Sequence, residues 1–108
     1  LHTADKPAFS CLASRFPYGE KITVEALKRV ERAEDGLRDM GFVNLRIRVQ
    51  GDTARIEIDA DQIARAAADP LRDQIVALLK KCGFRYIALD LQGYRRGSLN
   101  EVFTRIKT

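Results

Sequence analysis

Strict alternation of apolar and polar residues on both sides of a Gly-Asp turn constrains this fold more than any other feature. Residues 43–49 alternate in this way, residues 54–58 do so again, and Gly51-Asp52 lies between the two stretches. A strand directs successive side chains to opposite faces, so a period of two gives each strand one apolar and one charged face. The pattern predicts a β-hairpin with arginines along its charged face.

The apolar faces of the two strands must coincide, because a slip of one residue would turn every side chain to the wrong face. With a loop at 50–53, this condition determines which residues lie opposite each other across the hairpin. The expected apolar pairs are Val49–Ala54 and Ile47–Ile56, and the expected charged pairs are Arg48–Arg55 and Arg46–Glu57.

The two charged pairs lead to different expectations. Arg46 opposite Glu57 is an ordinary cross-strand ion pair, worth ~0.2–1 kcal/mol. Arg48 opposite Arg55 places like charges across the ladder, which is unfavourable. Either an anion is bound between the two guanidinium groups, or both side chains extend into water, and the residues alone leave both possibilities open.

Helical periodicity flanks the hairpin on both sides. Thr23 is expected to cap a helix that runs from residue 24 to Gly41, where glycine is typical of a helix C-terminus. A short helix is expected within residues 59–67, and a longer one begins at Asp69-Pro70 and ends before Gly83. Residues 85–91 are more apolar and predict a third strand buried on both faces.

These elements predict an α+β fold. The expected architecture is a split βαβ (ferredoxin-like) sandwich, in which an antiparallel sheet carries two main helices on one face. The first strand of such a sandwich would have to come from residues 8–18 or 20–24. Residues 1–19 are expected to form a linker or active-site segment that follows a domain absent from this chain, and residues 20–108 a single α+β domain.

The amino-acid composition limits the kinds of partner that this chain is expected to bind. No apolar run is long enough to span a membrane and no secretory signal is present, so we expect a cytoplasmic protein without a membrane partner. Two cysteines and one histidine are too few for a structural zinc site, and no metal site is expected. Arginine outnumbers lysine by 13 to 6, and composition leaves open whether these arginines bind an anionic partner or only solvate the surface. The basic patches are too thin to predict nucleic-acid binding.

The two cysteines differ in their surroundings. Cys82 falls on the apolar stripe of its helix and is expected to be a packing residue. Cys11 lies in an irregular segment close to Arg15, and a guanidinium stabilises a nearby thiolate and makes it reactive. Cys11 is therefore either a reactive thiol or a small buried residue, and local sequence does not separate the two.

Several sequence blocks resemble the LarE family of ATP-dependent sacrificial sulfur transferases, within the PP-loop ATP pyrophosphatase superfamily. The family helps to build the nickel-pincer cofactor of lactate racemase. The similarity extends from Lys6 onward over essentially the whole chain. The blocks that carry it are Cys-Leu-Ala-Ser-Arg at 11–15, Arg-Ile-Arg at 46–48, Ala-Arg-Ile-Glu-Ile at 54–58, Gly-Phe-Arg-Tyr at 83–86 and Gly-Tyr-Arg-Arg-Gly-Ser-Leu-Asn-Glu at 93–101.

This resemblance implies a reaction and a role for individual residues. In the family, ATP adenylates a carboxylate of pyridinium-3,5-biscarboxylic acid mononucleotide, a cysteine thiolate displaces AMP, and cleavage of the cysteine carbon–sulfur bond leaves dehydroalanine on the protein. By resemblance, Cys11 is the catalytic sulfur donor. The resemblance assigns Ser14, Arg15, Arg46, Arg48 and Arg55 to substrate and phosphate binding, with Glu34 and Glu57 as supporting acidic residues.

The chain departs from the family pattern in two respects. It has only two cysteines, whereas some members hold an iron–sulfur cluster with three, and the Ser-Gly-Gly-x-Asp-Ser phosphate loop is absent. ATP and Mg²⁺ are therefore expected to bind in an N-terminal PP-loop domain outside this chain, and the fragment alone is expected to be inactive. A homo-oligomer is also expected. The alternatives are a non-catalytic ligand-binding or oligomerisation module of a PP-loop ATPase, and a related enzyme that carries sulfur as a persulfide on Cys11.

Overall fold

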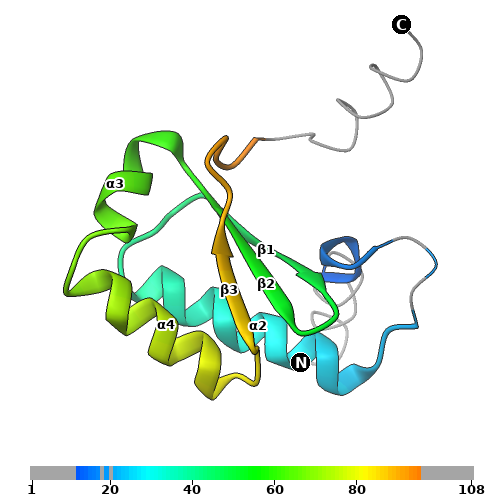
Figure 1. The fold of residues 1–108 in the computed structure, drawn as a ribbon. Coiled ribbons are helices and arrows are strands. Elements are labelled where there is room, and N and C mark those ends of the chain that lie inside the picture. Colours follow the sequence, from blue (N-terminus) through cyan, green and yellow to red (C-terminus); the bar gives the residue numbers. More distant parts are fainter. Residues whose placement is uncertain (1–11, 18, 20, 96–108) are drawn as a thin grey trace, which may run out of the picture.

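The computed structural model, which describes residues 12–17, 19 and 21–95, contains two main helices and a three-stranded sheet (Figure 1). The predicted α+β class is confirmed. In chain order the elements are η1 (Ala13–Arg15), α2 (Val24–Asp39), β1 (Leu45–Gln50), β2 (Thr53–Ile58), η2 (Ala60–Gln62), α3 (Ile63–Ala66), α4 (Leu71–Lys81) and β3 (Tyr86–Leu89).

The hairpin has the predicted register. All four expected cross-strand pairs, apolar and charged, are present between antiparallel β1 and β2. The loop is shorter than expected, because Gln50 pairs with Thr53 and leaves only Gly51-Asp52 to make the turn. The alternating pattern therefore determined which side chains lie on each face of the hairpin.

The third strand corrects the expectation of a wholly antiparallel sheet. The strand order is β1-β2-β3, and β3 runs parallel to β2. Parallel neighbours require a long crossover, which residues 59–85 provide through α3 and α4. The structure remains consistent with a split βαβ arrangement, but the described parts of residues 8–18 and 20–24 contain no strand.

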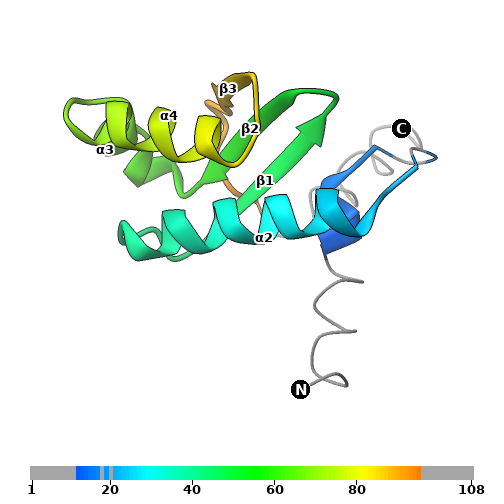
Figure 2. The same cartoon turned by 90° about the horizontal axis from the view of Figure 1, so that it is seen from below.

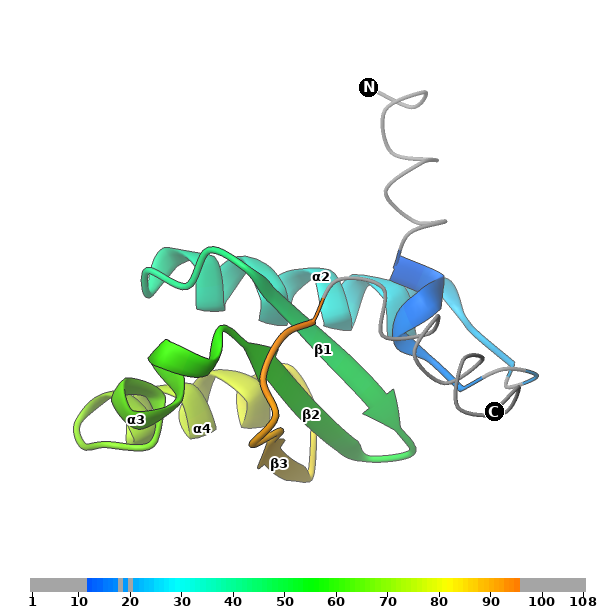
Figure 3. The same ribbon diagram turned by 90° about the horizontal axis from the view of Figure 1, so that it is seen from above.

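Both main helices lie on one face of the sheet, as predicted. Figure 2 views the molecule from the side of α2 and α4, and Figure 3 views it from the opposite side, where the two helices lie behind the strands. Within the described residues neither main helix covers the other face, and β3 alternates between exposed and half-buried residues instead of being buried on both faces as expected. No helix within the described ranges is long and apolar enough to cross a membrane.

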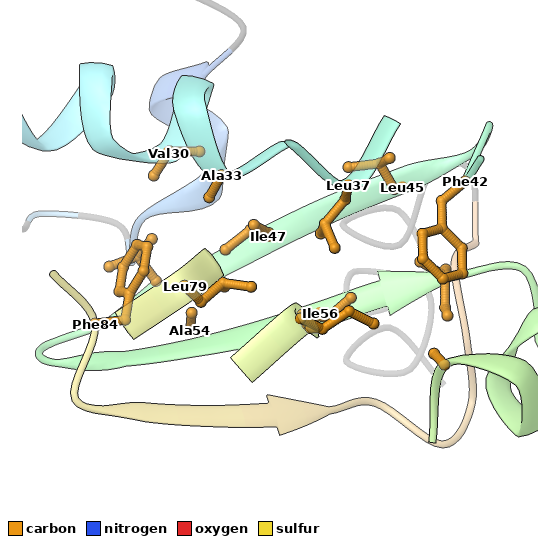
Figure 4. Close-up of a cluster of buried hydrophobic side chains, with 14 of the residues drawn as sticks. Val30, Ala33, Leu37, Phe42, Leu45, Ile47, Ala54, Ile56, Leu79 and Phe84 are labelled. Atoms are coloured by element: carbon orange, nitrogen blue, oxygen red, sulfur yellow. The ribbon is translucent and has the colours of Figure 1, made fainter. Parts of the chain in front are cut away.

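The core fills the space between the helices and the sheet (Figure 4). Each main helix ends at a glycine with positive φ, Gly41 at +101° and Gly83 at +104°. The phenylalanine that follows each glycine turns back, so that Phe42 N–H donates to Leu37 O and Phe84 N–H to Leu79 O. This arrangement is a Schellman motif, in which glycine adopts the left-handed conformation at low cost and the next side chain packs inward. Both phenylalanines are buried in the core.

Candidate functional site

The segment that follows Cys11 is attached to the outer side of the hairpin. Leu12 is only 6% exposed and belongs to the core, and the turn of η1 contacts β1. Arg48 on β1 donates from Nη1 to the backbone oxygen of Ser14 at 2.9 Å. Cys11 itself lies outside the described residues, so its position remains a prediction.

Glu34 is the carboxylate that holds this segment in place. It lies on α2 and is 1% exposed. Its two oxygens accept from Arg15, Oε2 from Nε at 2.8 Å and Oε1 from Nη2 at 3.2 Å. Oε2 also accepts from the backbone N–H of Ile47 at 2.9 Å, which joins α2 to β1. Arg38 adds a longer ion pair at 3.6 Å. Glu34 therefore connects the Ser14–Arg15 segment, the first helix and the first strand.

Glu57 resolves the repulsion expected between Arg48 and Arg55. Its Oε2 accepts from Arg48 Nε at 3.3 Å and from Arg55 Nη2 at 3.4 Å. The Glu57 side chain is almost fully buried, with 2% of the residue exposed. The negative group beside the two guanidinium groups is thus a carboxylate of the chain itself, which neither expectation from the sequence included.

The prediction that Arg46 and Glu57 form an ion pair is wrong. Although the two residues lie opposite each other, the ion pairs described for Glu57 are with Arg48 and Arg55. Arg48 reaches Glu57 along the diagonal between the strands, a distance that long side chains can span. Arg46 instead lies over the Tyr94 ring at 5.2 Å and reaches Tyr94 Oη from Nη2 at 3.5 Å.

Sequence reasoning missed two residues of this face, Asp90 and Tyr94. Asp90 Oδ2 lies 3.6 Å from Arg55 Nε, and Tyr94 covers Arg46. Both follow β3, and they reach the arginines only because β3 lies directly beside β2. Tyr94 lies in the Gly-Tyr-Arg block at 93–95, which indicates the family resemblance but does not predict where the tyrosine side chain lies.

Two buried polar atoms on the arginine-bearing face have no hydrogen-bond partner among the described residues. They are Arg46 Nε and Glu57 Oε1, and they belong to residues directly opposite each other on β1 and β2. A buried donor or acceptor without a partner costs ~1–3 kcal/mol, so such atoms are rare unless a ligand or water satisfies them. The pair therefore marks a place where a polar ligand could bind.

The electrostatic balance of this face leaves a positive excess. Among the described residues, four guanidinium groups and three carboxylates line this face, and Arg38 adds a further cation beside Glu34. Burial lowers the pKa of the Arg48 guanidinium; Glu57 opposes this shift, and the neighbouring charges of Arg46 and Arg15 add to it. An added anion would offset that repulsion. The cationic residues are Arg15, Arg46, Arg48 and Arg55, and the acidic residues are Glu34, Glu57 and Asp90.

Cys82 packs against the core at the end of α4, as predicted from its position on the helix. It is half-buried, and burial raises the pKa of its thiol; the opposing effects of Arg32, Arg29 and Lys81 are smaller. A protonated thiol is a poor nucleophile, and the packing of Cys82 against the core is consistent with a structural role.

Comparison with curated proteins identifies relatives of this chain by sequence. The chain is 48% identical over 101 residues to an uncharacterized protein of Synechocystis. It is 38% identical over 101 residues to the pyridinium-3,5-bisthiocarboxylic acid mononucleotide synthase of Lactiplantibacillus plantarum, and 30% identical over 89 residues to an uncharacterized protein of Methanocaldococcus jannaschii.

These alignments cover most of this chain but only part of each relative. They include 94%, 94% and 82% of the chain, yet 38%, 36% and 34% of the respective relatives. The chain thus spans little more than a third of the curated proteins it matches. No protein-family model matches it. The named relative supports the resemblance to the LarE family for this segment of sequence.

Proposed function

We propose that the chain is the C-terminal domain of a LarE-like sulfur transferase. The substrate would be pyridinium-3,5-biscarboxylic acid mononucleotide, which is converted to its thiocarboxylic form for a nickel-pincer cofactor. Similarity to a synthase named for the bisthiocarboxylic product supports this proposal. The arginine-bearing face of β1 and β2 offers the cationic donors that a nucleotide phosphate requires.

One observation carries the proposal: the segment directly after Cys11 is held beside those arginines. Arg48 binds the backbone of Ser14, and Glu34 binds Arg15 with two hydrogen bonds. A single peptide bond joins Cys11 to the buried Leu12, and consecutive Cα atoms lie ~3.8 Å apart. A thiol so closely tethered to this segment is suited to react with a ligand bound on the arginine-bearing face.

The proposed reaction has three steps. A substrate carboxylate attacks the α-phosphorus of ATP, forming an acyl adenylate and releasing pyrophosphate. The Cys11 thiolate then attacks the acyl carbon and AMP departs, which leaves a thioester. A base then removes the Cys11 α-proton, the electron pair left on Cα forms the Cα=Cβ double bond of dehydroalanine, and Sγ departs from Cβ with the acyl group as the thiocarboxylate.

Individual roles follow from the contacts of each residue. Arg46 retains a buried Nε–H that has no acceptor among the described residues, and it is assigned to the substrate phosphate together with Arg48 and Ser14. Arg15 is held by Glu34 and stabilises the anionic thiolate or phosphate near the Cys11 segment. Glu57 organises the face by pairing with both Arg48 and Arg55 and so offsetting the repulsion between them.

The remaining components belong to the complete enzyme. ATP and Mg²⁺ would bind in an N-terminal PP-loop domain, and the active form would be a homo-oligomer in the cytoplasm. Without that domain this chain is proposed to be inactive, because none of its residues forms a recognisable ATP phosphate loop.

Mass spectrometry of the complete polypeptide after a single turnover tests the mechanism. We expect the Cys11 peptide to lose the mass of one H2S, and Cys11→Ala to abolish thiocarboxylate formation. Cys82→Ala is the matched control, because this thiol is half-buried and is used only for packing. An intact Cys11 after product release would contradict the sacrificial mechanism, and a sulfane sulfur on Cys11 would instead indicate a persulfide carrier.

A second candidate is a non-catalytic ligand-binding or oligomerisation module of a PP-loop ATPase. The contacts of Glu57 favour it, because a carboxylate of the chain already bonds both Arg48 and Arg55. In that case the arginines stabilise the sheet, and Cys11 is incidental. The same Cys11→Ala variant separates the candidates, since a module would retain full sulfur transfer.

A further inference from the structure

A tight turn at residues 90–94 is fastened to the end of β2. Asp90 N–H donates to Ile56 O at 2.9 Å, and Tyr94 N–H donates to Ile58 O at 2.6 Å. The orange segment after β3 passes in front of the open face of the sheet in Figure 3. Gly93 permits this approach, because a Cβ at its position would lie 2.8 Å from Ile58 O. The backbone of this turn is therefore set by strand β2.

This turn provides the ring that covers Arg46. The Arg46 guanidinium carbon lies 5.2 Å from the centre of the Tyr94 ring, within the range of a cation–π interaction. The hydroxyl contact from Nη2 is long, at 3.5 Å, so the ring face is the main contact. The ring thus limits the orientations that the long Arg46 side chain can adopt.

The Tyr94 contact differs from those made by the neighbouring arginines in one respect. Arg48 and Arg55 each donate one N–H group to Glu57, an acceptor within the chain. A ring face holds a cation without accepting its N–H groups, and Arg46 Nε is buried without a partner among the described residues. Arg46 is therefore held in place while a donor is left for a ligand.

We propose that Tyr94 is a positioning residue that orients Arg46 for the phosphate of a pyridinium mononucleotide. This inference rests on the proposed function, because it assumes that Arg46 binds that phosphate. The ring holds the guanidinium before the ligand arrives, so less side-chain freedom is lost on binding. Its contribution is to ligand affinity and not to the bond-breaking steps at the carboxylate.

Single-turnover kinetics of the complete polypeptide with Tyr94→Leu and Tyr94→Phe tests this inference, because the proposed mechanism consumes Cys11 and each polypeptide reacts once. We expect Tyr94→Leu to raise the mononucleotide concentration that gives half of the maximal single-turnover rate roughly three- to tenfold, with the maximal rate constant retained, because binding is lost equally in the ground state and the transition state. Tyr94→Phe keeps the ring and should give a half-saturating concentration near that of the wild type. Tyr86→Leu is the matched control, since Tyr86 is 61% exposed and lies near Arg85 on another part of the sheet. An unchanged half-saturating concentration in Tyr94→Leu would overturn the inference.

A second measurement keeps this test independent of turnover. The NMR signal of the Arg46 side-chain Nε–H should show a ring-current shift that Tyr94→Leu removes and Tyr94→Phe preserves. Titration with nicotinic acid mononucleotide, a pyridinium mononucleotide without the second carboxylate, should move this signal and bind more weakly to Tyr94→Leu. If wild-type protein forms no thiocarboxylate but this titration behaves as expected, the proposed function fails and the role of Tyr94 stands. If the ring-current shift is absent, or affinity is equal in both proteins, the role of Tyr94 fails.

Discussion

Arg48 and Arg55 lie directly opposite each other on the hairpin, and both donate to the same oxygen of the buried Glu57. Like charges at such a position destabilise a sheet, so the pair requires a compensating negative group. Glu57, two residues after Arg55 on β2, provides that negative group, so the two arginines are compensated by a residue of the chain itself.

Replacing this carboxylate should expose the repulsion between the two arginines. We expect Glu57→Gln to lower the free energy of unfolding by ~1–3 kcal/mol, because a charged hydrogen-bond acceptor is lost from a largely buried position. Urea denaturation measures the change, with Asp73→Asn as a control at an exposed ion pair. Inorganic phosphate should stabilise Glu57→Gln more than the wild type, because the anion replaces the missing charge. Equal stabilisation of both proteins would contradict this account.

Glu34 should control attachment of the segment that follows Cys11. Glu34→Ala removes the carboxylate that accepts from both Arg15 and the Ile47 N–H, and we expect a loss of ~3–5 kcal/mol in unfolding free energy. Trypsin should also cut after Arg15 faster under native conditions, because the buried carboxylate no longer binds that side chain. Asp35→Ala is the control, since Asp35 pairs with Arg38 on the exposed side of the same helix. Unchanged cleavage at Arg15 in Glu34→Ala would show that other contacts hold the segment.

Two glycines with the same backbone conformation provide a matched test of the turn at 90–94. Gly93 and Gly19 both have φ of +86°, but an added Cβ meets Ile58 O at 2.8 Å at the first position and nothing within 4 Å at the second. Both Gly→Ala variants incur left-handed strain of about 1 kcal/mol. Gly93→Ala also incurs a backbone clash, so its urea midpoint should fall clearly below that of Gly19→Ala. Equal midpoints would mean that the turn can shift away from β2 at no cost.

The Cys82 thiol should react slowly in the folded protein. Burial raises its pKa, so a smaller fraction is thiolate at pH 8 than in the unfolded chain. We expect iodoacetamide to label Cys82 several-fold faster in urea than in buffer, measured in a Cys11→Ala background. Because the folded-state pKa is raised, the thiol favours the folded state fully below its unfolded pKa, and this contribution is lost as pH rises through the folded pKa. Equal labelling rates in urea and in buffer would show that the thiol is not protected.

Much of the fold could be predicted because its signals are local. The cap at Thr23 accepts from Ala26 N–H as expected, and the hairpin has the predicted register. The second main helix begins at Leu71, one residue later than Asp69-Pro70 suggested, a small displacement that is common at helix ends. The direction of β3 was not predictable in this way, because it depends on how the crossover at 59–85 packs and not on any pattern within the strand.

For the candidate site, the identity of most residues could be predicted from the sequence, but their contacts could not. Most of its arginines and acids could be selected from the sequence, through charge alternation on the hairpin and through family resemblance. Their partners could not, because an arginine side chain reaches several neighbours and the choice depends on which carboxylate lies closest after folding. Asp90 and Tyr94 were missed for that reason.

Sequence by itself determined which residues share a face of the hairpin and where the main helices begin and end. Both depend on spacing within a few residues, where the chain has few alternatives. Only the tertiary structure decided that Glu57 bonds two arginines, that Tyr94 rather than Glu57 holds Arg46, and that Glu34 holds the segment after Cys11. These contacts join residues up to 48 positions apart, and they form only after the helices and the third strand have packed against the hairpin.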